Sequence, residues 1–145
     1  MKYFTRQELI SSVEAERRNI INIPSGKEMW SLENLVYKVL DPLREHYGKP
    51  IIVTSGYRSP ELNTAIGGAT YSQHVKGEAA DIIAKNRADN ARLFDIILHR
   101  LPFDQLIWEK GDDTNPSWIH VSYKAVGNRG EVLRYRRGRY ERMGR

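Results

Sequence analysis

The residue that most constrains how this chain can fold is Asp81, a carboxylate in the middle of the apolar segment Ala79-Ala-Asp-Ile-Ile83. A short apolar run of this kind, rich in small and branched residues, predicts a buried strand. A buried carboxylate is costly unless a cation or hydrogen-bond donors reach it. The fold must therefore bring such a partner to the strand over 79–83.

Two histidines, His74 and His120, are candidates for that partner, with a metal ion between them and Asp81. His74 lies in a polar loop upstream, and Gly77 allows the backbone to turn it towards Asp81. His120 lies in a second predicted strand, Trp118-Ile-His-Val-Ser122. Two imidazoles and one carboxylate suit zinc, and three protein ligands leave the fourth position open, as in catalytic zinc sites. The alternative gives the three residues separate roles, as a surface loop histidine, a turn cap and a core histidine.

The chain has no cysteine among its 145 residues, so disulfides, thiolate zinc sites and cysteine nucleophiles are all excluded. Any metal must be held by nitrogen and oxygen ligands. The length fits one domain over residues 1–145, large enough to bury a core without cross-links.

Helical and strand signals alternate along the chain. Thr5-Arg-Gln-Glu8 and Ser25-Gly-Lys-Glu28 have the form of capping boxes, and they predict a helix over 6–17 and a main core helix over 28–47. We expect Pro42 to kink the core helix and Gly48 to end it. Further elements are expected as strand 51–54, helix 60–65, strand 79–83, a helix from 86 to 101, a long hairpin of strands 105–109 and 118–123, and an edge strand 132–136. This order predicts an α+β fold with a mixed or antiparallel sheet flanked by helices.

The positive charge is concentrated at the C-terminal end. Of a net +5 for the chain, residues 124–145 carry eight Lys or Arg and two acidic residues, which leaves the first 123 residues near −1. A basic C-terminal tail over about 134–145 suits an anionic polymer such as one of the cell wall; the alternative is a solvated terminal strand. Because no base-reading motif accompanies the charge, we do not expect nucleic acid as a partner.

The N-terminus, Met1-Lys-Tyr-Phe-Thr-Arg, lacks the apolar region of a signal peptide, and no segment approaches membrane-spanning length. We therefore expect a protein made in the cytoplasm without a signal peptide and with no membrane partner.

Three motifs in order resemble those of the M15 peptidases: Ser55-Gly-Tyr-Arg-Ser59, Ser72-x-His-x-x-Gly-x-Ala-x-Asp81 and Trp118-Ile-His120. That family contains zinc D-Ala-D-Ala carboxypeptidases and related phage endolysins, and it shares a fold with the zinc domain of Hedgehog proteins. The resemblance spans about residues 29–123. It implies a Hedgehog/DD-peptidase-like fold, Zn²⁺ as the cofactor, and His74, Asp81 and His120 as its ligands.

The resemblance also implies a reaction, the hydrolysis of peptidoglycan stem peptides by water that the metal activates. The chain would act as a D,D-carboxypeptidase or as an endolysin-type endopeptidase, at the cell wall or in the periplasm after release from the cytoplasm. The alternative, suggested by the Hedgehog relatives, is a zinc-containing binding module without turnover.

The general base is where the chain departs from the family pattern. Many members carry an acidic residue three positions before the last histidine, and Ser117 stands there in this chain. Glu109 is the first candidate, since it shares a face with His120 if residue 109 or 107 lies opposite 120 in the hairpin. Asp113, like its neighbour Asp112, is the second candidate, although acidic residues in such loops are usually simple turn residues.

Four further residues are expected around the substrate. The arginine that matches Arg58 lies in the cleft of family members, where it can bind a carboxylate or an oxyanion; it could instead brace its own loop. Ser72 and Gln73 are expected beside His74, although Ser72 could bond its own backbone. Tyr57 is expected in a cleft wall, with core packing as the alternative.

Overall fold

The computed structural model describes residues 1–144 and contains a six-stranded sheet in the order β1-β2-β4-β3-β5-β6. Neighbouring strands are antiparallel except β3 and β5, which are parallel. The strands are β1 (Ile51–Ser55), β2 (Ala79–Ala84), β3 (Gln105–Glu109), β4 (Trp118–Ser122), β5 (Glu131–Arg136) and β6 (Arg139–Arg142). The sheet is therefore mixed, and the predicted α+β class is confirmed.

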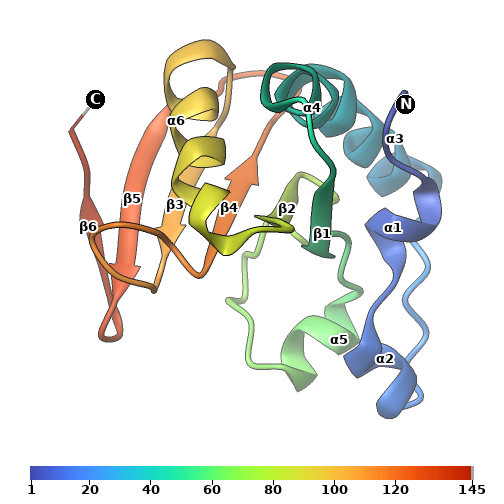
Figure 1. The fold of residues 1–145 in the computed structure, drawn as a ribbon. Helices are drawn as coiled ribbons and strands as arrows, with labels where there is room; N and C mark the ends of the chain where they lie inside the picture. Colours follow the sequence, from blue (N-terminus) through green and yellow to red (C-terminus); the bar gives the residue numbers. More distant parts are fainter. Residues whose placement is uncertain (145) are drawn as a thin grey trace.

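Helices flank this sheet and form most of the N-terminal third of the chain (Figure 1). They are α1 (Arg6–Ile10), α2 (Val13–Arg17), α3 (Gly26–Leu35), the π-helical η1 (Val36–Leu40), α4 (Asp41–Tyr47), α5 (Pro60–Ala65), the 3₁₀ turn η2 (Arg87–Asp89) and α6 (Asn90–Arg100). Each helix among residues 1–144 is too short or too polar to span a bilayer.

The hydrophobic core lies between the helices and one face of the sheet. Successive side chains of a strand point to opposite faces, and the face that packs against α6 carries Ile82, Leu106, Trp108, Ile119 and Val121. Phe94 of α6 meets Trp108 edge to face, with ring centroids 5.3 Å apart. The opposite face of the same strands carries Asp81 and His120.

The predicted core helix over 28–47 is divided into three pieces. α3 runs into the wider turn of η1, and α4 then begins one residue before Pro42. A proline has no N–H and its ring clashes with the carbonyl one turn earlier, so a π-helical turn upstream accommodates it. Gly48 ends α4 with φ at +78°, as predicted.

The predicted helix over 6–17 is also divided, because Ser11 and Ser12 interrupt it and Ser12 caps α2. The Thr5–Glu8 capping box is present. The capping box predicted at Ser25 is wrong, because the Ser25 hydroxyl bonds the Glu28 carboxylate and caps no backbone N–H.

The C-terminal segment differs most from the prediction. β5 is not an edge strand, since it lies between β3 and β6. Residues 134–142, expected in a basic tail, belong to the β5–β6 hairpin, whose turn places Arg137 and Gly138 at positive φ. Arg134 and Arg136 of that hairpin both pair with Asp113, at 2.7 and 3.5 Å. The arginines are thus held on a sheet.

Candidate active site

His74, Asp81 and His120 converge on the face of the sheet opposite α6. Asp81 lies opposite His120 in the β2–β4 register, and the loop before β2 brings His74 to the same point. Asp81 Oδ1 lies 3.3 Å from His74 Nε2 and 3.0 Å from His120 Nδ1. One potential ligand atom from each residue lies within 4.8 Å of the other two. Three separate roles for these residues are therefore excluded.

The loop holds His74 in the tautomer that a metal ligand needs. His74 Nδ1 lies 2.7 Å from the carbonyl oxygen of Gly56. Because a carbonyl only accepts, Nδ1 carries a proton, and Nε2 is the ring nitrogen that faces the cluster. Gly77 makes this loop possible: its φ is +74°, and a Cβ there would collide with the backbone carbonyl of Glu28.

Asp81 is held in its charged form. Burial would raise the pKa of this carboxyl, but His74 and His120 outweigh burial and hold the pKa well below its usual range. Arg58 adds a hydrogen bond at 3.4 Å to the second carboxylate oxygen. An ionised carboxylate beside two imidazole nitrogens is a donor set that suits Zn²⁺, with a position left for a substrate or water.

Glu109 lies on the same face as this cluster. Ile107 is opposite His120 and Glu109 is opposite Trp118, the register under which Glu109 and His120 share a face. Glu109 is only 8% exposed. Burial, reinforced by the charge of Asp81, outweighs His120, Lys110 and Arg58 and raises the pKa of Glu109 to about 7. A carboxyl with this pKa can accept and return a proton near neutral pH.

A cleft of about 850 Å³ contains the cluster and Glu109. Strands β2, β4, β3, β5 and β6 contribute its floor, and the loop over 66–74 contributes a wall. Most of the side chains predicted for the site line this cleft, namely Arg58, Ser72, Gln73, His74, Asp81, Glu109 and His120.

Arg58 combines the two roles considered for it. It braces its own turn through Ser55 Oγ, 3.1 Å from Nε, and it also reaches Asp81 in the cleft. Ser72 lines the cleft while its hydroxyl accepts the backbone N–H of His74. Gln73 lines the cleft and donates to Asp104 at 3.0 Å.

Tyr57 and Asp113 are not brought to the cleft. Tyr57 is 5% exposed within the hydrophobic core, so its prediction as a cleft wall is wrong and core packing explains it. The Asp113 side chain is 85% exposed and pairs with Arg134, so the structure does not support it as the base. Asp112 has the turn role considered for it, accepting the backbone N–H groups of Thr114 and Asn115.

Ser117 stands beside Glu109 across the hairpin. The backbone N–H of Ser117 donates to the carbonyl of Glu109 at 2.9 Å, and its hydroxyl accepts from Arg87. The neighbouring strand thus carries a carboxyl, that of Glu109, beside position 117.

Several cleft residues were not predicted, chief among them Leu133, Tyr135 and Tyr140 of the C-terminal hairpin. The rings of Tyr135 and Tyr140 lie 4.6 Å apart. Burial, together with the charges of Glu109, Tyr135 and Asp81, raises the pKa of Tyr140, which keeps its hydroxyl protonated as a donor. The signal in the sequence was the alternation of Leu133 and Tyr135 with arginines, which is typical of a strand with two different faces.

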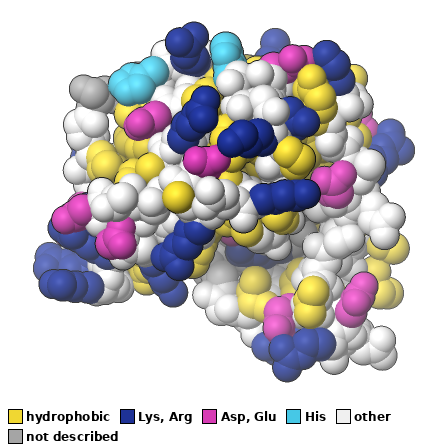
Figure 2. Space-filling view, in the orientation of Figure 1, with side chains coloured by type: hydrophobic (Ala, Val, Ile, Leu, Met, Phe, Trp, Pro, Cys, Tyr) yellow, Lys and Arg dark blue, Asp and Glu magenta, His cyan; other side chains and the backbone are white. Residues whose placement is uncertain are grey.

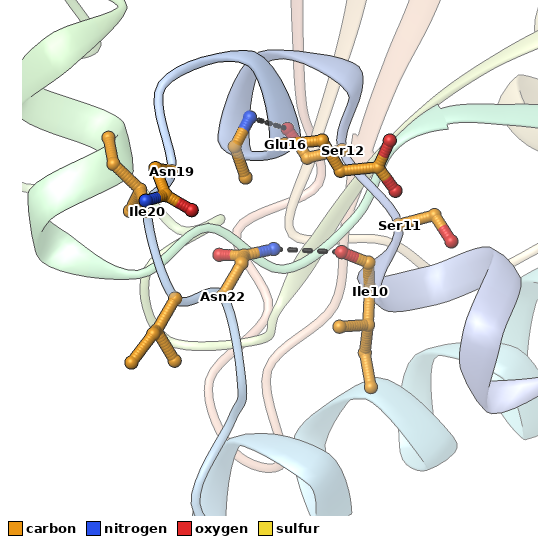
Figure 3. A pocket seen from close by; sticks show the side chains of 9 residues that line it. Ile10, Ser11, Ser12, Glu16, Asn19, Ile20 and Asn22 are labelled. Carbon is orange, nitrogen blue, oxygen red and sulfur yellow. Dashed lines mark hydrogen bonds between the residues drawn. The ribbon is translucent and has the colours of Figure 1, made fainter.

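A second, smaller hollow of about 330 Å³ lies near the N-terminus, between residues 10 and 22 (Figure 3). Asn22, its most buried polar side chain, is already committed to structure. It donates to the carbonyls of Ile10 and Tyr57 and accepts from the backbone of Ser59. Through these bonds Asn22 holds the N-terminal segment against the turn that carries Arg58.

The comparisons with known proteins agree with this geometry. A family model described as Peptidase M15 matches residues 2–122. The zinc D-Ala-D-Ala carboxypeptidase of Streptomyces albus G is 39% identical over 54 residues, which is 37% of this chain and 18% of that protein. The chain thus aligns with less than a fifth of that relative. Strands β5 and β6 lie beyond the residues that the family model matches.

Proposed function

Because the chain belongs to the M15 peptidase family, we propose that it hydrolyses peptide bonds in peptidoglycan stem peptides with a zinc ion held by His74, Asp81 and His120. Family membership and the nitrogen and oxygen donor set make the chain a zinc metallopeptidase. The substrate class is supported by the relative named as a zinc D-Ala-D-Ala carboxypeptidase. The observation that carries the proposal is the convergence of the three ligands beside a buried carboxyl.

Zinc, when bound, supplies a Lewis acid that polarises the scissile carbonyl and makes water more acidic. Glu109 accepts the proton of the attacking water and returns it to the leaving amine. Its position on β3, beside the His120 strand, supports this role. Its burial beside the cluster, which raises its pKa in the zinc-free chain, favours a carboxyl that takes up a proton and gives it back.

Arg58 binds negative charge on the substrate. A guanidinium has five N–H donors, and Arg58 directs single bonds to Ser55, Asn63 and Asp81. Arg58 lines the cleft, so the donors that remain suit an oxyanion or a substrate carboxylate. Ser72 and Gln73 border the same space.

A zinc-binding module without turnover is the second candidate, and the serine at position 117 favours it. Position 117 is where many family members carry their acidic residue. The two candidates differ in one respect, since only the first requires Glu109 to exchange a proton.

Metal analysis and product analysis together test the proposal. We expect about one zinc per chain, and fragments of stem peptides in the mass spectrum after incubation with peptidoglycan. Glu109→Gln should retain zinc and lower kcat by about 10²–10⁴-fold, the range that a positioned proton acceptor contributes. Glu45→Gln, at an exposed carboxylate of α4 that does not line the cleft, is the control and should behave as the wild type.

Two outcomes would contradict parts of this proposal. A zinc-loaded wild type that releases no fragment would favour the binding module. Loss of hydrolysis in Asp113→Asn, with Glu109→Gln still active, would show that the base has been assigned to the wrong carboxylate.

We also propose that the enzyme acts at the cell wall or in the periplasm, and that Arg137, Arg139 and Arg142 contact an anionic wall polymer there. Other arginines of this region are neutralised, Arg129 by Asp104 and Arg134 by Asp113. Figure 2 shows lysine and arginine side chains spread over the face in view. Binding to walls that carry such a polymer should weaken steeply with added salt, and substituting the three arginines by glutamine should remove that salt dependence. Binding that is insensitive to salt would contradict the contact.

A further inference from the structure

The sheet face that carries the metal centre continues past it towards the C-terminal hairpin. One row of opposed residues runs from His120 through Ile107 to Leu133. The next runs from Trp118 through Glu109 and Tyr135 to Tyr140. Because directly opposed residues share a face, the hairpin side chains extend the floor of the cleft.

The extension is long enough for several residues of a peptide. β6 is separated from β3 by β5, and strands lie about 4.8 Å apart, so the floor reaches roughly 10 Å beyond the strand of Glu109. An extended chain advances about 3.3–3.6 Å per residue. Roughly three residues of a bound peptide would therefore cross the hairpin.

The position of Glu109 decides which part of the substrate lies there. This carboxyl must reach the leaving amine in order to protonate it. Glu109 is on β3, between the ligand strands and the hairpin. The hairpin therefore lies on the leaving-group side, and the acyl part of the substrate lies over β2 and Arg58.

The surface of the extension suits a peptide. Leu133 and Tyr135 are half-buried, and Tyr140 is 60% exposed at the rim. Tyrosine offers a broad apolar ring together with a hydroxyl that bonds backbone groups. Lys124 and Arg129 also line the cleft, and both approach Asp104, which partly neutralises them.

We propose that Leu133, Tyr135 and Tyr140 bind the residues that follow the scissile bond, so that the enzyme cuts internal bonds followed by two or more residues. This inference rests on the proposed function and deepens it, since it favours endopeptidase over carboxypeptidase action. A single released residue would end near β3 and leave the hairpin without a contact.

A peptide series on the zinc-loaded full chain tests this. The peptides share one acyl part and carry one, two or three residues after the scissile bond. We expect kcat/KM to rise by at least about tenfold from one residue to three, as an added apolar contact produces. In Tyr140→Ala the kcat/KM of the three-residue peptide, divided by that of the one-residue peptide, should fall towards one. Tyr37→Ala, an exposed tyrosine of η1 near the N-terminus, should keep the wild-type ratio.

Equal kcat/KM for all three peptides in the wild type would overturn the inference without any variant. The inference would also be overturned if Tyr140→Ala lowered kcat/KM by the same factor for all three peptides. If Tyr140→Ala does not fold, Leu133→Val can replace it. This change removes one methylene from the floor of the cleft and should lower the kcat/KM of the three-residue peptide relative to that of the one-residue peptide.

Failure of the proposed function gives a different result, in which no peptide of any length is cut although zinc is bound. Peptide binding to zinc-loaded Glu109→Gln then tests the hairpin by itself. We expect the three-residue peptide to bind more tightly than the one-residue peptide, and equal Kd values would overturn the inference.

Discussion

Asp81 and Glu109 are buried carboxyls on one sheet face, yet their surroundings move their pKa values in opposite directions. Burial opposes the charge of both. His74 and His120 outweigh it at Asp81, whereas Glu109 has weaker compensation and a pKa of about 7. The low pKa of Asp81 suits a metal ligand, and the raised pKa of Glu109 suits a group that exchanges a proton.

The raised pKa of Glu109 predicts how the stability of the zinc-free protein depends on pH. The folded pKa of about 7 exceeds the ordinary value of 4.5 for a glutamate, so the folded state holds its proton more tightly than the unfolded state. The free energy of unfolding therefore falls as pH rises from about 4.5 to 7, by up to ~3 kcal/mol at 1.36 kcal/mol per pKa unit.

Urea unfolding of the zinc-free wild type and of Glu109→Gln, at pH 5 and pH 8, measures this. Glutamine cannot ionise, so the variant should gain stability relative to the wild type at pH 8 and not at pH 5. A difference between the two proteins that is the same at both pH values would contradict the prediction.

At this scale the ligands were open to prediction from sequence because each lies in an unusual local context. A carboxylate inside an apolar strand and a glycine before it are local signals: the structure brings Asp81 to both histidines, and Gly77 has the positive φ that its turn requires. Glu109 could be assigned only conditionally, since its face depends on a pairing register. Tyr57 and Asp113 were wrongly placed because long-range packing and Arg134 on β5 determine where they lie.

At the scale of elements, Asp104 joins three segments by hydrogen bonds: the start of β3 beside it, the loop that contains Gln73, and residues 129–131 at the start of β5. Its buried carboxylate accepts from Arg129 at 2.7 Å and from Gln73 in the loop beside the metal centre. Its carbonyl accepts the backbone N–H of Glu131, where β5 begins. This residue positions the start of the hairpin against β3.

Asp104→Asn should therefore destabilise the fold. Burial raises the pKa of Asp104, but Arg129 and Gln73 outweigh it and lower the pKa to about 2. The charge thus contributes stability above about pH 3.8, and that stability is lost as pH falls towards 2. Because Arg129 is half-exposed, we expect a loss of only ~1–2 kcal/mol at pH 7.

Denaturant titration of Asp104→Asn, of Arg129→Ala and of the double variant measures this interaction. A coupling free energy near zero in the cycle would contradict it. Equal loss of stability in Asp104→Asn at pH 7 and pH 2 would contradict the assignment to charge.

Elements with strong local signals were predicted well. The helix over 60–65 begins with a serine cap and a proline, and the strand over 105–109 is a short apolar run; both are confirmed with the predicted bounds. β6 was missed because arginines dominate it and its stability comes from pairing with β5. The parallel pairing of β5 with β3 joins residues far apart in the chain, which no local pattern reveals.

In the whole molecule, the metal centre and the hydrophobic core occupy opposite faces of one sheet. Helix α6 packs on the face that carries Trp108 and Ile119, and His120 and Asp81 lie on the other face. The core is thus built without the metal ligands, and the fold should persist when the metal is removed.

Zinc removal should lower the melting temperature without unfolding the chain. A ligand at 100 times its Kd stabilises by ~2.7 kcal/mol, which for a chain of this size corresponds to a fall in Tm of roughly 5–10 °C. Thermal unfolding by circular dichroism, with and without a chelator, measures the change. His120→Ala is the control, because its Tm should not respond to zinc.

A chelated protein without a cooperative transition would contradict this, since it would show that the metal holds the core together. If the wild type lost its zinc and its Tm did not change, zinc would not bind the folded chain more tightly than the unfolded chain, and the prediction would be contradicted.

The strands that carry Asp81 and His120 lie inside the sheet, each paired on both sides. Amide groups in such strands exchange with solvent only when the structure opens widely. An arriving ion thus meets donors that are already in place, and its capture is governed by how fast it reaches them through the open cleft.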